Sequence, residues 1–327
     1  MQRTLDIAIE QFPLAEPFVI ARGAKTAADA VRVTLYSNGC AGHGECIPYP
    51  RYGETPQSVC AVIEEARNAI EAGCQRLDLL NIMPAGAARN AVDCALWDLD
   101  AKQLGIRAAQ LAGLHRLPAA VTAYTISAGT PQAMAASAKA HADKPVLKIK
   151  LAGDGDEERI AAVCQAAPLS QLIVDANEAL REDTVEAMLA ACAAAGVTLI
   201  EQPMPAGKDQ CLADIHHAVA ICADESVHGI DDLAALRKRY DAVNIKLDKT
   251  GGLTAALAMT ARASELGFSI MIGSMVGTSL SMAPAMLLTP FAQWVDLDGP
   301  LLLAKDRNPG LRYDGCIIQP PAAELWG

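Results

Sequence analysis

The feature that most constrains the fold is a regular alternation of short apolar strands with alanine-rich helices, which begins near residue 120. Helical patterns such as 156–167, 183–196 and 252–267 fill the gaps between the strands. The eight predicted strands cover residues 121–126, 146–150, 171–175, 197–201, 219–224, 242–246, 268–273 and 292–297. Eight such strands at a spacing of 20-odd residues are typical of a parallel (β/α) barrel. A doubly wound open sheet is the competing α/β fold, but no GxGxxG motif follows any strand to support a dinucleotide site.

The first part of the chain follows a different pattern. Residues 4–10 and 31–37 alternate polar and apolar side chains, which predicts antiparallel strands. Residues 61–72 and 86–104 place apolar side chains at helical spacing. The N-terminal part is therefore predicted to be an α+β domain.

Three parts of the chain follow from these patterns. We expect the N-terminal α+β domain over residues 1–115, the barrel domain with the active site over residues 116–300, and a C-terminal segment over residues 301–327. The C-terminal segment has no helical pattern, and its residues 312–321 are predicted to form a strand. We expect this strand to return and pair with the N-terminal domain.

The composition excludes several classes of protein. Of the 327 residues, 52% are hydrophobic, so the chain can bury a large core. The net charge of −11, without any block of basic residues, argues against a nucleic-acid partner. Residues 266–295 carry no charge, but glycines, serines and prolines interrupt this run, so strand, loop and buried helix are favoured over a membrane span.

The cysteines indicate a reducing environment. The ten cysteines contain no CxxC pair, and several lie inside apolar runs, as Cys222 does. This pattern fits buried thiols better than a disulfide framework or a zinc site. Residues 1–12 lack the apolar core of a signal peptide, so we expect a cytoplasmic protein.

Charged side chains recur at the ends of five consecutive predicted strands. In order they are Lys148 and Lys150, then Asp175 with Asn177, then Glu201, then Asp224, then Lys246. From Lys150 onward the steps are 22 to 26 residues, one strand and helix each. A solvated strand face would explain an isolated lysine pair, but solvation does not explain the order cation, anion, anion, anion, cation on five consecutive strands. Because chemistry in such barrels lies at the C-terminal ends of the strands, we expect the active site here.

The three carboxylates predict a metal site. Asp175, Glu201 and Asp224 would repel one another if they converged without a cation. An all-oxygen set suits Mg²⁺, with Mn²⁺ as the alternative, and none of the six histidines falls at a strand end as zinc would favour. A salt-bridge network between the acids and the lysines, without a metal, is the competing interpretation.

The lysines predict proton transfer at a carbon. Lys150 and Lys246 end the second and sixth strands, which are four apart, so we expect them to face each other across the mouth of the barrel. A substrate carboxylate on the metal would present its α-carbon to one lysine on each side, and the cation would stabilise the charge formed when the proton leaves. Two opposed acid/base groups are the machinery of a racemase or epimerase. Lys148, on the same strand face as Lys150, is predicted to lower the pKa of Lys150 and to hold substrate.

The segments VLKIK, IVDAN, LIEQP, ICADES and NIKLDKTGGL together resemble the enolase superfamily, specifically its muconate-lactonising branch. Within that branch the sequence is similar to dipeptide epimerases of the L-Ala-D/L-Glu type, and the resemblance covers essentially the whole chain. It implies a modified (β/α)8 barrel of the (β/α)7β kind, an N-terminal domain that caps it, and one Mg²⁺ per subunit. Because the family tends to assemble, we also expect a homo-oligomer.

The resemblance also implies roles for individual residues. Asp175, Glu201 and Asp224 are expected to hold Mg²⁺, with Asn177 in support, and Lys150 and Lys246 to form the acid/base pair. The Asp-x-Asp at the end of the eighth strand, Asp296 and Asp298, is expected to bind the α-ammonium group of a dipeptide. The other expected substrate contacts are Thr125, Lys148, Val276 and Thr278. The candidates for a cation that meets the glutamate side chain are Arg22, Lys25 and Arg51.

The function we expect is Mg²⁺-dependent epimerisation of a dipeptide such as L-Ala-D-Glu, as would serve murein peptide recycling. The alternatives on the same scaffold are an o-succinylbenzoate synthase, a cycloisomerase and an N-acylamino-acid racemase. Their substrates lack the ammonium group that Asp296 and Asp298 would bind. A Schiff-base aldolase needs no carboxylate cradle, and a non-catalytic binding protein would not need both Lys150 and Lys246.

Overall fold

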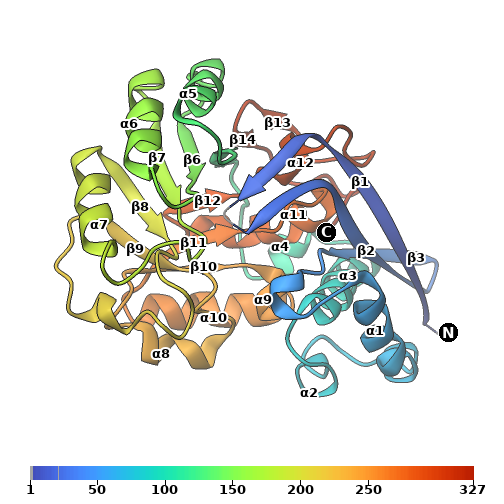
Figure 1. Cartoon of the computed structure of the whole chain (residues 1–327). Helices are drawn as coiled ribbons and strands as arrows, with labels where there is room; N and C mark the ends of the chain where they lie inside the picture. Colours follow the sequence, from blue (N-terminus) through green and yellow to red (C-terminus); the bar gives the residue numbers. More distant parts are fainter. Residues whose placement is uncertain (1–2, 21) are drawn as a thin grey trace.

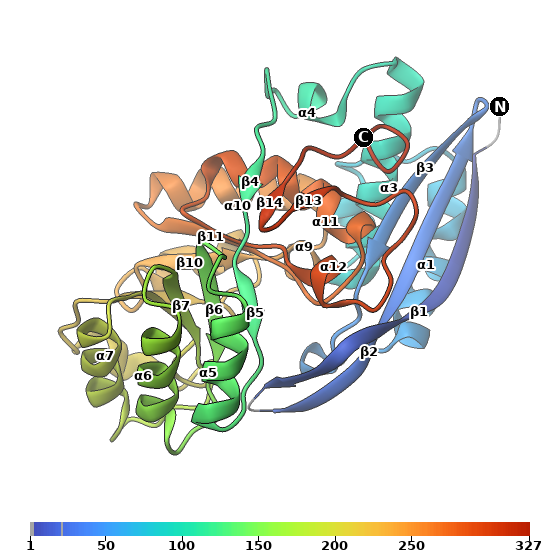
Figure 2. The ribbon, with the colours of Figure 1, turned by 90° about the horizontal axis from the view of Figure 1, so that it is seen from above.

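The computed structural model describes residues 3–20 and 22–327. An N-terminal antiparallel sheet with its helices lies beside a parallel eight-stranded sheet whose outer face is covered by helices (Figure 1). Figure 2 shows that the long pair of strands β1 and β2 extends from the N-terminal sheet to the barrel and ends beside α5. The backbone N–H of Ala128 donates to the carbonyl oxygen of Val19 at 3.0 Å, which ties this end of β1 to the barrel.

The N-terminal sheet has the strand order β1-β2-β3, with both pairs antiparallel. The strands of this sheet and the helices that accompany it in the N-terminal part are β1 (Thr4–Ile20), β2 (Gly23–Ser37), β3 (Cys40–Cys46), η1 (Pro50–Tyr52), α1 (Pro56–Glu71), α2 (Leu79–Ile82), α3 (Ala87–Leu104) and α4 (Ala108–Leu111). Asn38 and Gly39 both have positive φ between β2 and β3, as the two central residues of a type I′ hairpin turn require. The predicted antiparallel strands and the two predicted helices are thus confirmed.

Helix α3 packs directly on β3 because β3 carries glycines where the two backbones meet. A Cβ atom added to Gly42 or Gly44 would overlap the carbonyl oxygen of Ala95 or Ala91, respectively. The sequence of β3 therefore fixes the distance between the sheet and the helix that supports it.

The barrel sheet has the order β12-β11-β10-β9-β8-β7-β6-β5, and all its strand pairs are parallel. Its strands are β5 (Tyr124–Ile126), β6 (Val146–Lys150), β7 (Gln171–Asp175), β8 (Val197–Glu201), β9 (Ala220–Ala223), β10 (Ala242–Ile245), β11 (Ser269–Gly273) and β12 (Trp294–Asp296). The ring is drawn together between β5 and β12, where the N–H of Ala123 donates to the carbonyl oxygen of Val295 at 2.8 Å. The predicted eight-stranded parallel barrel is confirmed.

Helices and short helical turns connect the strands. They are α5 (Pro131–Ala140), α6 (Asp156–Ala166), α7 (Val185–Ala194), η2 (Gln210–Ala213), η3 (Ile230–Asp232), α8 (Leu233–Leu236), α9 (Leu247–Thr250), α10 (Leu253–Glu265), α11 (Ser279–Ala285), η4 (Met286–Phe291) and α12 (Gly299–Leu302). The predicted helices over 156–167, 183–196 and 252–267 correspond to α6, α7 and α10. The uncharged run 266–295 contains β11, α11 and η4, as expected for buried strand, loop and helix.

Two predictions about strands need correction. The predicted first strand, 121–126, is divided: β4 (Ala120–Val121) belongs to a separate small sheet, and only β5 joins the barrel. The chain changes partners at Thr122, whose N–H donates to Cys316 while its side chain accepts from the N–H of Leu297.

The C-terminal strand does not pair with the N-terminal sheet. It forms a hairpin of β13 (Tyr313–Asp314) and β14 (Ile317–Ile318), and β14 pairs with β4. Contacts with the N-terminal part come from other residues of the tail. The N–H of Gly327 donates to Asp98 on α3 at 2.7 Å, and the N–H of Ala304 donates to Pro13 on β1 at 2.9 Å.

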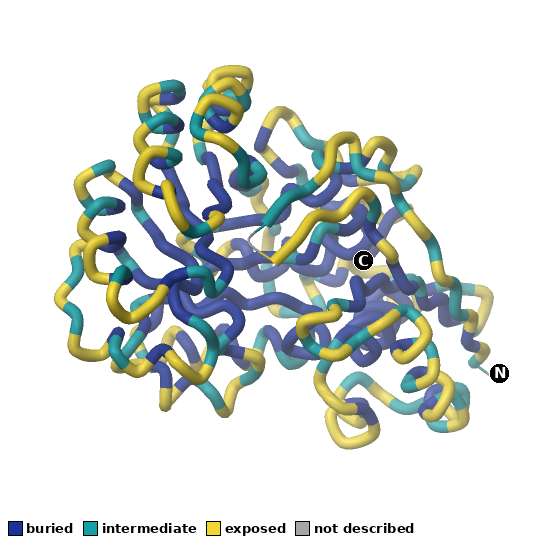
Figure 3. The backbone as a smooth tube through the Cα atoms, viewed as in Figure 1, coloured by how far each residue is buried: buried dark blue, intermediate teal, exposed yellow. Residues whose placement is uncertain are grey.

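The strand alternation divides the core into two layers. Leu147 and Ile149 of β6 face the helices, whereas Val146 packs inside the barrel against a layer that includes Ile173 and Met271. The barrel strands are buried along most of their length, and the exposed residues lie mainly on the outer helices and loops (Figure 3). Within residues 3–20 and 22–327, no helix combines the length and apolar character needed to cross a bilayer.

Candidate active site

A cavity of about 430 Å³ lies between the C-terminal ends of the barrel strands and the N-terminal domain. Residues of both parts line it. From the barrel these include Thr125, Lys148, Lys150, Asn177, Asp224, Glu225, Lys246, Val276, Asp296 and Asp298. From the N-terminal part they include Phe18, Arg22, Lys25, Tyr49, Arg51 and Tyr52. The structure thus brings most of the predicted site residues to one cavity.

The two predicted acid/base lysines each contact a different carboxylate. Lys150 Nζ lies 2.5 Å from Asp175 Oδ2, and Lys246 Nζ lies 2.7 Å from Asp224 Oδ2. Both lysines are largely buried, with 8% and 7% of their surface exposed, and both line the cavity. In the observed strand order β6 and β10 are four apart, so the two ammonium groups approach the cavity from opposite sides of the ring.

Lys148 is the most deeply buried of the lysines at the described strand ends. Its Nζ lies 2.5 Å from Glu201 Oε2, 2.7 Å from Asp296 Oδ2 and 3.1 Å from Asp175 Oδ2. Burial would lower the pKa of Lys148, but these three carboxylates outweigh it and raise that pKa well above the usual range. Its charge is therefore balanced by the surrounding acids.

The carboxylates at the strand ends differ in their electrostatic surroundings. Burial would raise the pKa of Asp175, but Lys150 and Lys148 hold that pKa below its usual range. Burial would also raise the pKa of Asp224, but Lys246 and Lys249 hold it well below. Burial and the charge of Asp175 together raise the pKa of Glu201 to about 8. Glu201 is thus the acid in this group that most lacks a compensating cation.

The donor set fits a hard divalent cation. Asp175, Glu201 and Asp224 are almost fully buried and offer only oxygen atoms, which are the ligands that Mg²⁺ prefers. Glu201 Oε2 accepts no hydrogen bond from the described residues, although Lys148 lies beside it as an ion pair. As the side chains stand, no three acidic, histidine or cysteine side chains of the described residues converge closely enough to hold a metal. Lys148 lies among these carboxylates, so they would hold a cation after its ammonium group moves aside.

The two aspartates at the end of β12 are buried beside Thr125. The N–H of Thr125 donates to Asp298 Oδ2 at 2.7 Å, and Lys148 donates to Asp296 Oδ2. Burial and the nearby charge of Asp296 raise the pKa of Asp298 to about 7. Asp296 Oδ1 accepts no hydrogen bond from the part of the chain that the structure describes. A cationic group in the cavity would satisfy both carboxylates.

Two predicted substrate contacts on the loop after β11 are placed differently. Val276 lines the cavity. Thr278 does not, because its side chain is fully buried and its Oγ1 lies 2.7 Å from Glu45 Oε2 on β3. Thr278 therefore joins the barrel to the N-terminal sheet, and its predicted contact with substrate is corrected to this structural one.

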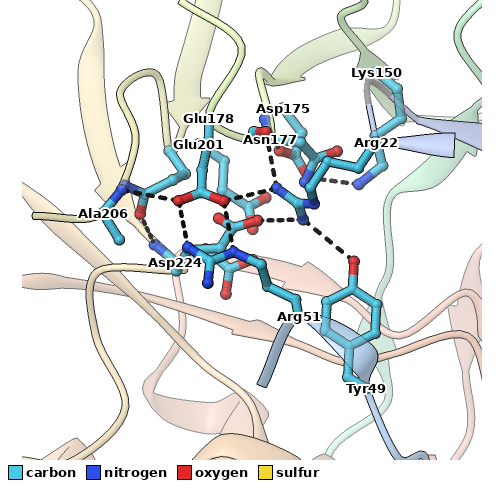
Figure 4. Close-up of polar contacts among 12 residues, drawn as sticks. Arg22, Tyr49, Arg51, Lys150, Asp175, Asn177, Glu178, Glu201, Ala206 and Asp224 are labelled. Atoms are coloured by element: carbon cyan, nitrogen blue, oxygen red, sulfur yellow. Dashed lines mark hydrogen bonds and ion pairs between the residues drawn. The ribbon is translucent and has the colours of Figure 1, made fainter. Parts of the chain in front are cut away.

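The N-terminal part covers the cavity through a network of charged residues that the sequence did not reveal. Arg22 and Arg51 both contact Glu178, which follows β7, and Arg22 also contacts Glu225, which follows β9 (Figure 4). Glu178 and Glu225 stand beside predicted ligands in the segments IVDANE and ICADES, which is the signal that could have identified them. Lys25 lies 4.7 Å from the ring centroid of Tyr49.

Lys249 is a second group that the sequence did not reveal. Its buried Nζ contacts Asp224 Oδ1 at 2.5 Å, the carbonyl oxygen of Asp224 at 2.6 Å and that of Asn244 at 3.0 Å. Because an ammonium group has three N–H donors, these three contacts satisfy it. Lys249 thus fixes one oxygen of Asp224, and the other oxygen remains on the side of Lys246.

Comparison with known proteins places this geometry in a family. Residues 2–113 match the mandelate racemase / muconate lactonizing enzyme N-terminal domain, and residues 132–322 match the enolase C-terminal domain-like family. The L-Ala-D/L-Glu epimerase of Escherichia coli K12 is 46% identical over 313 residues, which cover 95% of this chain and 98% of that protein. The N-acetyl-D-glutamate racemase of a Pseudoalteromonas species is 43% identical over 288 residues, covering 88% of this chain and 91% of that one.

Solved structures agree with the sequence comparison. An enolase family member from Agrobacterium tumefaciens with homology to dipeptide epimerases, bound to sodium and L-Ala-L-Glu, is 53% identical. Its TM-score is 0.98, and the match covers 99% of this chain and 100% of that one. A dipeptide epimerase from Methylococcus capsulatus, complexed with Mg and L-Arg-D-Lys, is 29% identical with a TM-score of 0.91 over 98% of each chain. The chain belongs to the mandelate racemase / muconate lactonizing enzyme family of the enolase superfamily.

Proposed function

We propose that this protein is a Mg²⁺-dependent dipeptide epimerase of the L-Ala-D/L-Glu type, an isomerase that inverts the α-carbon of the C-terminal residue. The observation that carries the proposal is the placement of Lys150 and Lys246 on opposite sides of one cavity that also contains Asp296 and Asp298. A base on each side supports inversion, and the aspartate pair supports a substrate with a free ammonium group. The relatives named as epimerases of L-Ala-D/L-Glu support the substrate class.

The metal belongs with the three carboxylates. Asp175, Glu201 and Asp224 would hold Mg²⁺, and Asn177 supports Asp175, whose Oδ1 accepts the N–H of Asn177 at 2.9 Å. When bound, Mg²⁺ would offset the repulsion among these acids and stabilise negative charge on the substrate carboxylate. Mn²⁺ has the same ligand preference and is the expected substitute.

Lys150 and Lys246 would transfer the proton. One lysine, in its neutral form, removes the α-proton from its side, and the other, as an ammonium group, delivers a proton from the opposite side. The pKa of Lys246 is of direct interest here. Burial lowers this pKa, but the charges of Asp224 and Glu201 raise it by more, and the pKa lies well above its usual range. Lys246 is therefore protonated at neutral pH while it contacts these acids. This protonation state suits the donor half of the reaction.

Substrate orientation requires groups at both ends of the dipeptide. Asp296 and Asp298 would bind its α-ammonium group, with Thr125 holding Asp298 in place, and Lys148 would contact its carboxylate. Val276 lines the same cavity. Among the three cations near the capping segment, Lys25 is the one whose side chain makes no hydrogen bond or ion pair within the described residues. We propose that it meets the side chain of the C-terminal residue. An ammonium group binds a carboxylate as a point charge, so this contact favours glutamate without excluding related residues.

A second candidate is racemisation of an N-acylated glutamate, because a named racemase of N-acetyl-D-glutamate is 43% identical to this chain. An acetyl group carries no charge, so it would bring no cation to Asp298, and Asp296 Oδ1 would remain without a hydrogen-bond donor from the described residues. This cost disfavours the acylated substrate relative to the dipeptide. The substrates of an o-succinylbenzoate synthase or a cycloisomerase would likewise bring no cation to these two carboxylates.

The deciding experiment compares kcat/KM for L-Ala-D-Glu and N-acetyl-D-glutamate at equal Mg²⁺. A ratio of 100 or more in favour of the dipeptide supports the proposal, since a paired ammonium group is worth a few kcal/mol. A ratio below one would assign the enzyme to N-acylamino-acid racemisation. Two further expectations stand with the proposal: cytoplasmic localisation, which the ten free cysteines support, and a homo-oligomer, which light scattering tests.

A further inference from the structure

Glu178 occupies a backbone conformation that a glutamate adopts only when its surroundings hold it there. Asn177 and Glu178 follow β7 with φ of 44° and 70°, and neither residue is a glycine. Two successive non-glycine residues in the left-handed region are uncommon, and such residues cluster at functional sites. The Glu178 N–H donates to the carbonyl oxygen of Gln202 at 2.9 Å, which fixes this conformation against the loop after β8.

The side chain of Glu178 connects the barrel to two segments of the N-terminal part. Its Oε1 accepts from Arg51 Nη2 at 2.9 Å and from the N–H of Ala206 at 2.8 Å. Its Oε2 accepts from Arg51 Nε at 2.9 Å and from Arg22 Nη1 at 3.0 Å. Arg51 is therefore bound by a bidentate pair, the strongest arrangement between these two groups. Figure 4 shows the Glu178 carboxylate joined to both guanidinium groups.

Glu178 is ionised at neutral pH. Burial would raise the pKa of Glu178, but hydrogen bonds from Arg51 and Ala206 hold that pKa below its usual range. Only 10% of its side chain is exposed, so the ion pairs are partly shielded from solvent and salt.

Arg22 has little capacity left for a substrate. Besides Glu178, its Nη1 donates to the carbonyl oxygen of Asn177 at 2.9 Å. Its Nη2 donates to Glu225 Oε1 at 2.6 Å and to Tyr49 Oη at 3.2 Å. Both terminal nitrogens are thus fully used by protein acceptors, since each carries two hydrogens. The carboxylate that Arg22 neutralises at Glu225 is buried and has no other cation in contact among the described residues.

We propose that Glu178 is a positioning residue, which fastens the end of the β1–β2 pair through Arg22 and the η1 turn through Arg51 over the mouth of the barrel. In this arrangement Arg22 and Arg51 form a latch with Glu178 and Glu225, and they do not bind the side chain of the substrate. The proposal rests on the proposed function, because it assigns the latch to the cavity in which the dipeptide would be enclosed. The proposal also predicts that the latch aids the binding of every dipeptide to the same extent, whatever the charge of the dipeptide's side chain.

Limited proteolysis tests the latch without any substrate. Trypsin cleaves after Arg22 and Lys25, the two sites at the end of the β1–β2 pair. We expect Glu178→Ala to accelerate cleavage there by about tenfold or more, and Glu178→Gln by less because it retains two acceptor positions. Glu182→Gln, an exposed glutamate four residues further along, is the matched control and should cleave at the wild-type rate. An unchanged cleavage rate in Glu178→Ala would overturn the latch.

Kinetics test the second half of the proposal. Arg22→Gln should raise KM for L-Ala-D-Glu and for L-Ala-D-Gln, whose side chain is uncharged, by the same factor, about tenfold, with kcat changed by less than threefold. A loss confined to L-Ala-D-Glu would show that Arg22 binds the side-chain carboxylate and would overturn the assignment. The Mg²⁺ affinity of Glu178→Ala, measured by calorimetry, should equal that of the wild type, which excludes a disturbed Asp175. Failure to turn over any dipeptide would count against the proposed function, and the proteolysis result would still decide the latch.

Discussion

Lys148 and Asp296 form a buried ion pair inside the barrel, with Nζ of the lysine 2.7 Å from Oδ2 of the aspartate. Lys148 lies on β6 and Asp296 on β12, the two strands on either side of β5. The same ammonium group lies 2.5 Å from Glu201 Oε2. One side chain therefore touches both the predicted metal ligands and the predicted ammonium site. Lys148 therefore lies between the site proposed for the metal and the site proposed for the α-ammonium group of a dipeptide. The carboxylate of the dipeptide would lie within its reach.

Replacing one lysine should separate exchange from inversion. Lys150→Ala and Lys246→Ala should each reduce epimerisation by about 10³-fold, since general acid–base catalysis contributes 10²–10⁴-fold. Each variant should still exchange the α-proton of one diastereomer only, the one whose proton faces the remaining lysine. NMR in D₂O on the separate diastereomers measures this. Inversion at a near wild-type rate in either variant would contradict the two-base mechanism.

Glu201→Gln should abolish the response to Mg²⁺ without unfolding the protein. The raised pKa of Glu201, about 8, shows that its charge is disfavoured in the fold, so a neutral amide of the same shape costs little. At Mg²⁺ 100-fold above its Kd the wild type should gain about 2.7 kcal/mol of stability, and the variant almost none. Thermal unfolding of each protein with and without Mg²⁺ measures these two gains in stability. If Mg²⁺ stabilised the variant as much as the wild type, Glu201 would not be a metal ligand.

Asp298 should give the dipeptide reaction a characteristic pH dependence. Its pKa is raised to about 7, so below that pH it is protonated and cannot pair with an ammonium group. We therefore expect kcat/KM for L-Ala-D-Glu to rise with pH up to about 7, by as much as tenfold per unit, and then to lose this dependence. Asp298→Asn should lower kcat/KM by about 100-fold and remove this limb. The same limb persisting in Asp298→Asn would assign it to another group.

Gly44→Ala should destabilise the protein strongly. A Cβ at Gly44 would overlap the backbone of Ala91 on α3, and neither backbone can move without separating the sheet from its helix. We expect a loss of about 3 kcal/mol or more in the free energy of unfolding. Gly39→Ala is the control, because its Cβ would meet no atom within 4 Å and its cost is only that of the φ of 77°, about 1–2 kcal/mol. Equal losses in denaturant titrations would contradict the packing account.

The barrel and its charged strand ends could be predicted from the sequence because they depend on local patterns. Lys150, Asp175 and Glu201 each end a short apolar strand, and the spacing of one strand and helix places them side by side on a parallel sheet. The same reasoning failed for 121–126, where Thr122 changes partners between two sheets. Hydrophobic pattern does not encode which of two sheets a strand will join.

The covering network was beyond prediction for a different reason. Glu178 contacts Arg51 although they are 127 residues apart, and Arg307 contacts Glu45 over 262 residues. No periodicity links such pairs, because a loop glutamate and an exposed arginine are each ordinary in isolation. Thr278 shows the converse, since its place in a motif predicted substrate contact whereas its hydroxyl is used by Glu45.

The most direct test of the central claim follows the α-proton of glutamate by NMR while the protein acts on L-Ala-D-Glu with Mg²⁺ in D₂O. Inversion by two opposed lysines predicts that L-Ala-L-Glu accumulates with deuterium at its α-carbon, while unreacted L-Ala-D-Glu keeps its proton early in the reaction. Deuterium entering L-Ala-D-Glu without formation of the other diastereomer would contradict the account, because it would mean that one base acts from one side only.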